Sequence, residues 1–245
     1  MARIPLLRVI LDQEPNAGDW NMAVDEALLG TAVSRGVATL RWYRWREATV
    51  SLGYFQKSAD LLETPELVGR PVVRRLSGGG AIVHDDEWTY SLALPASQTL
   101  FVQPHELYDI VHHAISAGLQ DLGFPVVTRG ETHKRPDEPL LCFQRQDAHD
   151  ITLHGYKVLG SAQRRRRGAI LQHGSLICGK SGYAPHIPGL LDLSESRIPT
   201  HLNQLLMQRV ATVIADANEP DQLSAMEIAA SKQLCEKQCT NVGQQ

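Results

Sequence analysis

A cysteine and a lysine that lie close in the sequence form the pair with the clearest chemical potential. Cys142 follows two leucines and precedes Phe143, and Lys157 lies in a segment with the pattern of a β-strand. A thiol attacks as its thiolate, so a catalytic cysteine needs a neighbour that lowers its pKa from about 8.5. The ammonium group of Lys157 could have this effect. A small core cysteine and a solvated lysine are the alternatives, and the spacing alone leaves both open.

A run of one serine and three glycines stands between two apolar segments. Its members are Ser77, Gly78, Gly79 and Gly80. Consecutive glycines let the main chain approach a ligand and direct its N–H groups at negative charge. A flexible hairpin turn is the competing interpretation, and the sequence lacks the Gly-Lys-Ser/Thr ending of a Walker phosphate loop. The polar residues on either side, Arg75 before the run and His84 after it, favour a ligand-binding loop.

Small and polar residues interrupt two later strands. Gly160, Ser161 and Ala162 weaken their strand unless a ligand or another strand packs closely against it. His173 and Gly174 lie within an otherwise apolar strand, so His173 is either part of a site or a core histidine with satisfied hydrogen bonds. A ligand channel beside Lys157 would account for the small residues at 160–162, and close packing of another strand would account for them equally well.

The run 164–167 consists of four arginines. Such a run is usually a solvated face, but it could also attract an acidic protein partner. The histidines, aspartates and cysteines of the sequence lack the spacing of an established metal site, so we expect no metal.

The composition is that of a soluble globular protein. Of 245 residues, 43% are hydrophobic and 21% are charged, and the formal net charge is −3. A near balance of charge argues against nucleic-acid binding, and no apolar run approaches the roughly 18 residues of a membrane span. The N-terminus does not read as a signal peptide, and four cysteines without disulfide-like density indicate a reduced, cytoplasmic protein.

The periodicity predicts the elements that must hold these residues in place. Helices are expected at 19–34, 60–68, 104–122, from 202 onward and at 222–237. Strands are expected at 38–45, 50–52, 72–76, 81–84, 88–94, 150–153, 156–163 and 169–177, with a polar loop at 128–140. This order predicts an α+β fold, with a mixed β-sheet flanked by helices, in a single domain of residues 1–245. The segment from about 200 is predicted to be helical.

Taken together, these motifs resemble the biotin/lipoate protein ligase and lipoyl/octanoyl transferase superfamily. The resemblance covers roughly residues 5–215 and rests on 21–26, 74–85, 142–143, 155–163 and 170–175, in that order. Within the superfamily the chain is most similar to the cysteine-dependent octanoyltransferases of the Gram-positive type, in which a Cys-Phe pair also precedes the lysine strand. The segment 86–91, Asp-Glu-Trp-Thr-Tyr-Ser, favours the same branch. The segment 144–148, Gln-Arg-Gln-Asp-Ala, departs from the family's usual Asp-Ala-Pro-Ser.

The resemblance implies a biotin/lipoate-ligase-like catalytic domain that acts as an acyltransferase. Octanoyl would pass from acyl carrier protein to Cys142, beside Lys157, and then to a lysine of a lipoyl domain or a glycine-cleavage H-type protein, with no cofactor. The implied substrate-binding residues are Arg75, Ser77, Gly78, Gly79, Gly80, His84, Gly160, Ser161, Ala162, His173 and Gly174. Three alternatives stay open: an ATP- and Mg-dependent lipoate–protein ligase, an octanoyl amidotransferase between carrier proteins, and a non-catalytic acyl-binding module.

Overall fold

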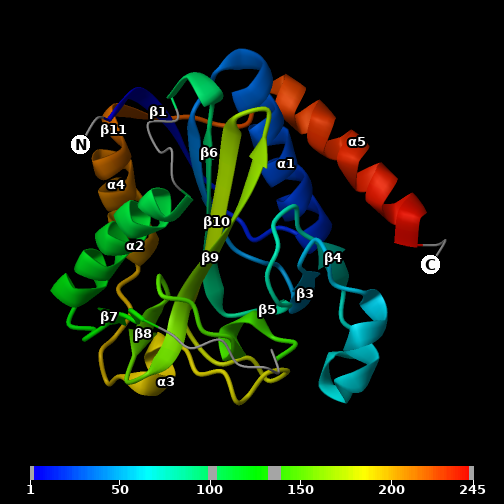
Figure 1. The fold of residues 1–245 in the computed structure, drawn as a ribbon, viewed down its shortest axis with the longest axis vertical. Coiled ribbons are helices and arrows are strands. Elements are labelled where there is room, and N and C mark those ends of the chain that lie inside the picture. Colours follow the sequence, from blue (N-terminus) through cyan, green and yellow to red (C-terminus); the bar gives the residue numbers. More distant parts are fainter. Residues whose placement is uncertain (1–2, 99–103, 132–138, 243–245) are drawn as a thin grey trace.

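An eight-stranded mixed sheet forms the centre of the molecule (Figure 1). The computed structural model describes residues 3–98, 104–131 and 139–242. In spatial order the strands are β11 (Ala215–Pro220), β1 (Ile4–Leu11), β2 (Thr39–Tyr43), β6 (Glu87–Leu94), β10 (Ala169–Ile177), β9 (Tyr156–Arg166), β8 (Ile151–Leu153) and β7 (Val127–Thr128). Strand β1 pairs in parallel with β2 and β11, and the other neighbours are antiparallel.

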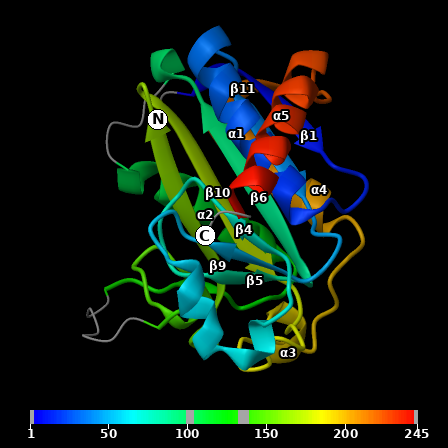
Figure 2. The same ribbon diagram turned by 90° about the vertical axis from the view of Figure 1, so that its right-hand side faces the viewer.

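Helices cover both faces of this sheet. They are α1 (Gly18–Arg35), α2 (Pro104–Asp121), α3 (Leu190–Leu193), α4 (Leu202–Ile214) and α5 (Ala225–Val242). The larger core cluster joins α2 and α4 to one face, and a second cluster joins α1 to the other. Helix α5 packs along the outside of α1 (Figure 2).

A small second sheet lies beside α1 and carries the glycine run. Its order is β4 (Val72–Arg74), β3 (Thr49–Leu52) and β5 (Ile82–His84), and the glycines connect β4 to β5. Two 3-10 turns, η1 (Ser58–Glu63) and η2 (Pro65–Leu67), link β3 to β4. A third, η3 (Ala96–Gln98), follows β6, and a fourth, η4 (Cys142–Gln144), carries the cysteine.

Strands β8 and β9 form a hairpin, and it places Lys157 on β9 next to the η4 segment that precedes the hairpin in sequence. His154 and Gly155 form its turn with φ values of 50° and 85°. Positive φ at both central residues is typical of the type I′ turn, whose twist matches that of paired strands.

The α+β fold with a mixed sheet and flanking helices is confirmed. Two predicted features need correction: the segment 60–68 is made of 3-10 turns, and the segment from about 200, predicted to be helical, contains strand β11. The first strand, β1, was not predicted. Part of the predicted polar loop, 132–138, lies outside the described residues. Among the residues that are described, no helix has the length and apolar character needed to cross a membrane.

Candidate active site

Cys142 and Lys157 meet where strand β9 of the large sheet begins. Lys157 Nζ lies 3.8 Å from Cys142 Sγ and 2.7 Å from Asp150 Oδ1. Turn η4 brings the half-buried cysteine to the start of β9, where Lys157 is only 6% exposed. The Lys157 ammonium is therefore shared between a carboxylate and the sulfur, and the solvated lysine of the plainer interpretation is excluded.

The protonation of Lys157 is decided by its neighbours. Burial acts to lower the pKa of Lys157, but the charges of Cys142 and Asp150 outweigh burial and raise it. Asp150 is itself buried, and this burial raises its pKa despite the attraction of Lys157. The lysine is therefore an ammonium near neutral pH, which is the form that stabilises a thiolate.

A second buried cation lies across the glycine run from the cysteine. A Cβ built on Gly79 would be 3.1 Å from Arg75 Nη2 and 4.0 Å from Cys142 Sγ. Gly79 also has a φ of +94°, a conformation that residues with a side chain rarely adopt, so its backbone favours glycine. Arg75 is 3% exposed, and its guanidinium donates to the carbonyls of Ser51, Gly78 and Gly80 and to the Ser51 hydroxyl.

Arg75 lacks a carboxylate partner among these contacts. Burial lowers the pKa of Arg75 to about 10, although the nearby Cys142 acts in the opposite direction. A buried guanidinium bonded to neutral groups stabilises negative charge that forms close to it, on the sulfur or on a bound acyl group.

A narrow cavity of about 30 Å³ opens from the cysteine between the small sheet and the large sheet. Its lining includes Cys142, Arg75 and His84, together with residues of β9 and β10: Gly160, Ser161, Ala162, His173 and Gly174. Apolar side chains form another part of the wall: Met22, Tyr43, Trp45 and Ile82. The structure therefore brings most of the predicted site residues around one cavity, and their binding of substrate stays a prediction.

The small residues of β9 and β10 have packing reasons as well. A Cβ on Gly160 would be 2.2 Å from Lys157 Cε, and a Cβ on Gly174 would be 2.2 Å from Ser161 Oγ. Glycine at 160 thus makes room for the lysine itself. Close packing alone therefore explains why residues 160 and 174 are glycines. Both residues also line the cavity, so their role in binding a ligand stays a prediction.

Ser77 does not line the cavity but belongs to a buried chain of hydrogen bonds. Its Oγ lies 2.5 Å from His173 Nε2, and His173 Nδ1 lies 3.2 Å from Asp25 Oδ2. Asp25 also pairs with Arg41 and accepts a hydrogen bond from Tyr43. The pKa of Asp25 is lowered: burial acts to raise it, but His173 and Arg41 outweigh burial. This chain connects helix α1 to the glycine run through β10.

A second serine–histidine–acid chain holds the other end of the glycine segment. Ser51 Oγ lies 2.7 Å from His84 Nε2, and His84 Nδ1 lies 2.8 Å from Glu87 Oε1. The imidazole stacks on the indole of Trp45, with ring centroids 3.7 Å apart. Burial lowers the pKa of His84, although Glu87 opposes this effect. A neutral, stacked His84 forms a fixed wall of the cavity.

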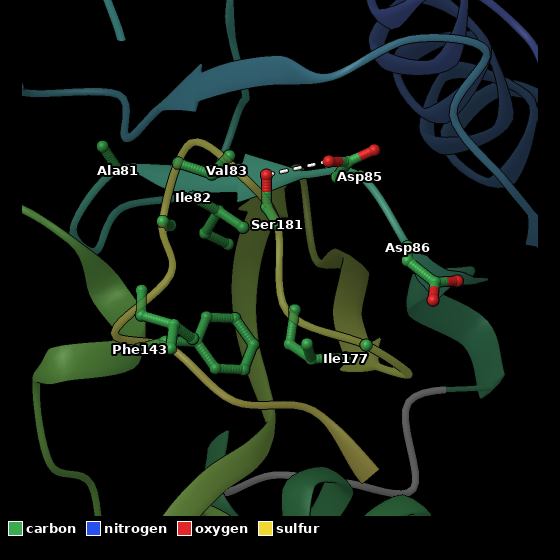
Figure 3. Close-up of a pocket in the computed structure, with 11 residues that line it drawn as sticks. Ala81, Ile82, Val83, Asp85, Asp86, Phe143, Ile177 and Ser181 are labelled. Atoms are coloured by element: carbon green, nitrogen blue, oxygen red, sulfur yellow. Dashed lines mark hydrogen bonds between the residues drawn. The ribbon is translucent and has the colours of Figure 1, made fainter. Parts of the chain in front are cut away.

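Phe143 anchors the turn that carries the cysteine. Its ring lines a small pocket of about 10 Å³ below β5, where Ile82 and Ile177 also lie (Figure 3). Asp85 and Ser181 close the pocket with a 2.8 Å hydrogen bond. Lys157 lies over the same ring, with its Nζ 5.4 Å from the ring centroid of Phe143. Phe143 is thus packed among apolar side chains on one face and next to Lys157 on the other, so we assign it a positioning role.

The arginine run is divided by the alternation of its strand. Arg166 pairs with Glu26 at 2.8 Å, and the Arg164 guanidinium lies over the ring of Tyr54. Arg165 and Arg167 are exposed. The run is therefore not a uniform solvated face.

Several residues of the site were not predicted as such. Asp150, Asp25, Ser51 and Glu87 hold the lysine and the two histidines. Only Asp150 had a usable signal, because a hairpin with a turn at 154–155 places it near the small residues that follow Lys157. Among the described residues no group of three or more histidines, cysteines or acids could hold a metal ion.

The chain is similar to known proteins over most of its length. Residues 18–220 match the family model described as the lipoyl protein ligase A/B catalytic domain. Octanoyltransferase LipM of Moorella thermoacetica is 41% identical over 169 residues, which cover 66% of this chain and 62% of that protein. LipM of Staphylococcus epidermidis is 33% identical over 225 residues, covering 86% and 79%.

Solved structures of lipoate ligases share the fold. A lipoate-protein ligase A bound with ATP has a TM-score of 0.74 at 20% identity, with 96% of this chain and 95% of that chain covered. A bipartite ligase of Thermoplasma acidophilum, from a study that includes its E2 lipoyl domain, has a TM-score of 0.71 at 18% identity, with 96% and 93% covered. The family match extends over most of the chain and includes Cys142, Lys157 and the glycine run. The chain therefore belongs to the lipoyl protein ligase A/B catalytic domain family.

Proposed function

We propose that this chain is an octanoyltransferase that holds octanoyl on Cys142 as a thioester and passes it to a lysine of a carrier protein. The observation that carries the proposal is the 3.8 Å contact between Lys157 Nζ and Cys142 Sγ at the cavity. The LipM relatives support octanoyl as the acyl group. The T. acidophilum ligase and its E2 lipoyl domain support a lipoyl domain as the acceptor.

In the first half-reaction the Cys142 thiolate attacks the carbonyl carbon of octanoyl-acyl carrier protein. The bond from that carbon to the donor sulfur then breaks, and the donor thiolate takes a proton from the Lys157 ammonium. The products are the acyl-enzyme, a free donor thiol and a neutral Lys157 amine. Asp150 keeps Lys157 in place through this change of charge.

In the second half-reaction the neutral Lys157 acts as the base. It takes one proton from the acceptor lysine's ammonium, and the resulting amine attacks the thioester carbon. Collapse of the tetrahedral intermediate forms the amide, returns the Cys142 thiolate and releases the second nitrogen proton to solvent. An already activated thioester supplies the free energy, so the proposal requires neither ATP nor a metal.

The oxyanion of both steps needs donors directed at it. The N–H groups of Cys142 and Ala81 are committed to main-chain hydrogen bonds with Ala81 and Leu140. Within the described part of the chain, the N–H groups of Gly79 and Gly80 donate to no residue. We therefore assign the oxyanion to these glycines and to the positive charge of Arg75.

Intact-protein mass spectrometry tests the proposal directly. Wild type and Cys142→Ala are mixed with octanoyl-acyl carrier protein without ATP. We expect a hydroxylamine-sensitive octanoyl adduct on the wild type alone, which then decays on addition of a lipoyl domain. If Cys142→Ala instead attaches lipoate with ATP, the chain is a ligase. If only an octanoylated carrier protein donates the acyl group, it is an amidotransferase.

A further inference from the structure

Two adjoining aromatic side chains extend into solvent from the turn after β3. Tyr54 is 43% exposed and Phe55 is 83% exposed, and their rings meet edge to face with centroids 5.0 Å apart. A single exposed apolar residue is ordinary on a protein surface. A paired, outward-facing phenylalanine and tyrosine beside a reactive centre is the kind of feature that marks an interaction site.

The main chain of this turn is fixed by Arg74. Its Nη1 donates to the carbonyl oxygens of Gly53, Tyr54 and Gln56 at 3.0, 3.3 and 2.5 Å. The Gln56 side chain accepts from Gly53 N–H and donates to the Leu140 carbonyl. Arg74 is thus used to hold a turn rather than a substrate. A backbone held in this way presents Phe55 without the ordering cost of a flexible loop.

The turn also joins the two walls of the cavity. A Cβ on Gly53 would be 2.1 Å from the Gly79 carbonyl oxygen, and a Cβ on Gly79 would be 4.0 Å from Cys142 Sγ. On the other wall, Arg164 follows the cavity-lining Ala162 along β9, and its guanidinium carbon lies 4.9 Å from the Tyr54 ring centroid. Tyr54, Phe55 and Arg164, which we call the aromatic rim, therefore lie next to the glycine run and β9.

We propose that the aromatic rim docks the folded carrier domain that presents the acceptor lysine. The inference rests on the proposed function. A lysine side chain reaches only roughly 6 Å from its Cα, so the accepting domain must lie against the surface that surrounds Cys142. A donor group on a longer arm has no such constraint. Phe55 supplies apolar contact area, and Arg164 suits an acidic side chain near the acceptor lysine.

The test measures the two half-reactions, acylation of the enzyme and transfer to the acceptor, separately for the Phe55→Ala variant. Acylation is measured with octanoyl-CoA, and transfer from the isolated acyl-enzyme is measured to an E2 lipoyl domain and to Nα-acetyl-lysine amide. We expect the KM for the lipoyl domain to rise at least tenfold, with acylation and transfer to the small amine within twofold of wild type. Phe55→Leu should recover most of the loss. Met226→Ala removes an apolar side chain that is 61% exposed on α5 and should change nothing.

Three other results would contradict the proposal that the aromatic rim docks the carrier domain. They are a KM for the lipoyl domain within twofold of wild type, equal losses with the domain and the small amine, or a loss confined to a carrier-protein donor. If the wild type forms no acyl-enzyme, the proposed function is wrong. The docking role of the aromatic rim is then tested by calorimetric measurement of lipoyl-domain binding. In that case Phe55→Ala must weaken the Kd at least tenfold, and an unchanged Kd or no binding by wild type refutes the inference.

Discussion

Asp150 Oδ1 lies 2.7 Å from Lys157 Nζ, so the lysine that contacts Cys142 is also paired with a buried carboxylate. Both side chains are at most 6% exposed. The carboxylate is held in turn, because Asp150 Oδ2 accepts a hydrogen bond from Asp147 N–H. Burial of a lysine favours its neutral form, and the pairing reverses this preference.

The first prediction concerns Asp150→Asn, which keeps the shape of the side chain and removes its charge. Burial lowers the pKa of Lys157, and Asp150 is one of the groups that raise it, so the variant should have a lower lysine pKa. The alkaline limb of the acylation rate, where Lys157 loses its proton, should move to lower pH. We expect a roughly tenfold slower acylation at pH 8.

Stopped-flow acylation by octanoyl-CoA between pH 6 and 10 measures this change. Asp150→Glu should recover part of the rate, and Asp216→Asn, which changes an exposed acid on β11 at the far edge of the sheet, should leave the alkaline limb in place. An alkaline limb that stays where it is in Asp150→Asn would show that the carboxylate has only a structural role.

The second prediction uses the reactivity of the cysteine itself. Lys157→Met removes the ammonium that stabilises the thiolate, so alkylation of Cys142 by iodoacetamide should slow at least tenfold at pH 7 and approach the wild-type rate at high pH. Cys142→Ala supplies the background. Cys178 should contribute little to it, because burial and then the nearby acids raise its pKa to about 12. Lys180→Met, which removes an exposed lysine, should leave the rate unchanged; equal rates in wild type and Lys157→Met would refute the pairing.

The third prediction compares two neighbouring glycines. Gly79→Ala places a Cβ at a φ of +94° and 3.1 Å from Arg75 Nη2, whereas Gly78→Ala meets nothing within 4 Å. The left-handed conformation costs a residue with a side chain about 1–2 kcal/mol. Gly79→Ala should therefore lower the free energy of unfolding by about that amount and slow acylation by displacing Arg75. Urea unfolding and acylation rates of the two variants check this, and equal effects at both positions would contradict it.

The sequence predicted the elements that contain strong periodicity and missed those that depend on their neighbours. Strand β11, Ala-Asp-Ala-Asn-Glu-Pro, is polar and largely exposed, and only its parallel pairing with β1 makes it a strand. Strand β2 was predicted from its alternation, but all of its residues are buried. Arg41 is 0% exposed because Asp12 and Asp25 pair with it, and neither partner is near it in the sequence.

The candidate site divides in the same way. Cys142, Lys157 and the glycine run could be found by residue type and order, because their motifs occur together in the order of the family that the sequence resembles; the spacing of each motif alone left a structural interpretation open. The residues that hold these groups in place could not be found in this way. Ser51 and Glu87 hold His84 from different strands, and no local pattern marks either residue. The split of the arginine run between Glu26 and Tyr54 likewise depends on packing against α1 and the turn after β3.

The last prediction concerns a buried histidine behind the cavity wall. His112 Nδ1 lies 2.5 Å from the His149 carbonyl oxygen, and its Nε2 lies 2.6 Å from Ser161 Oγ. Burial lowers the pKa of His112 to about 4, against an opposing effect of the hydrogen bond with His149. A histidine in the unfolded chain titrates near 6.5. Below that pH the unfolded state binds a proton that the folded state refuses, so stability falls as the pH drops from 6.5 to 4.

The contribution of His112 to this fall should be about 3 kcal/mol between pH 7 and pH 4. In urea unfolding measured across this range, wild type should therefore lose about 3 kcal/mol more than His112→Gln, which cannot be protonated. His113→Gln removes the exposed neighbouring histidine and should show the wild-type dependence. A His112→Gln curve parallel to that of wild type would mean that the folded protein accepts the proton at 112, and the contact with Ser161 would then have to rearrange as the pH falls.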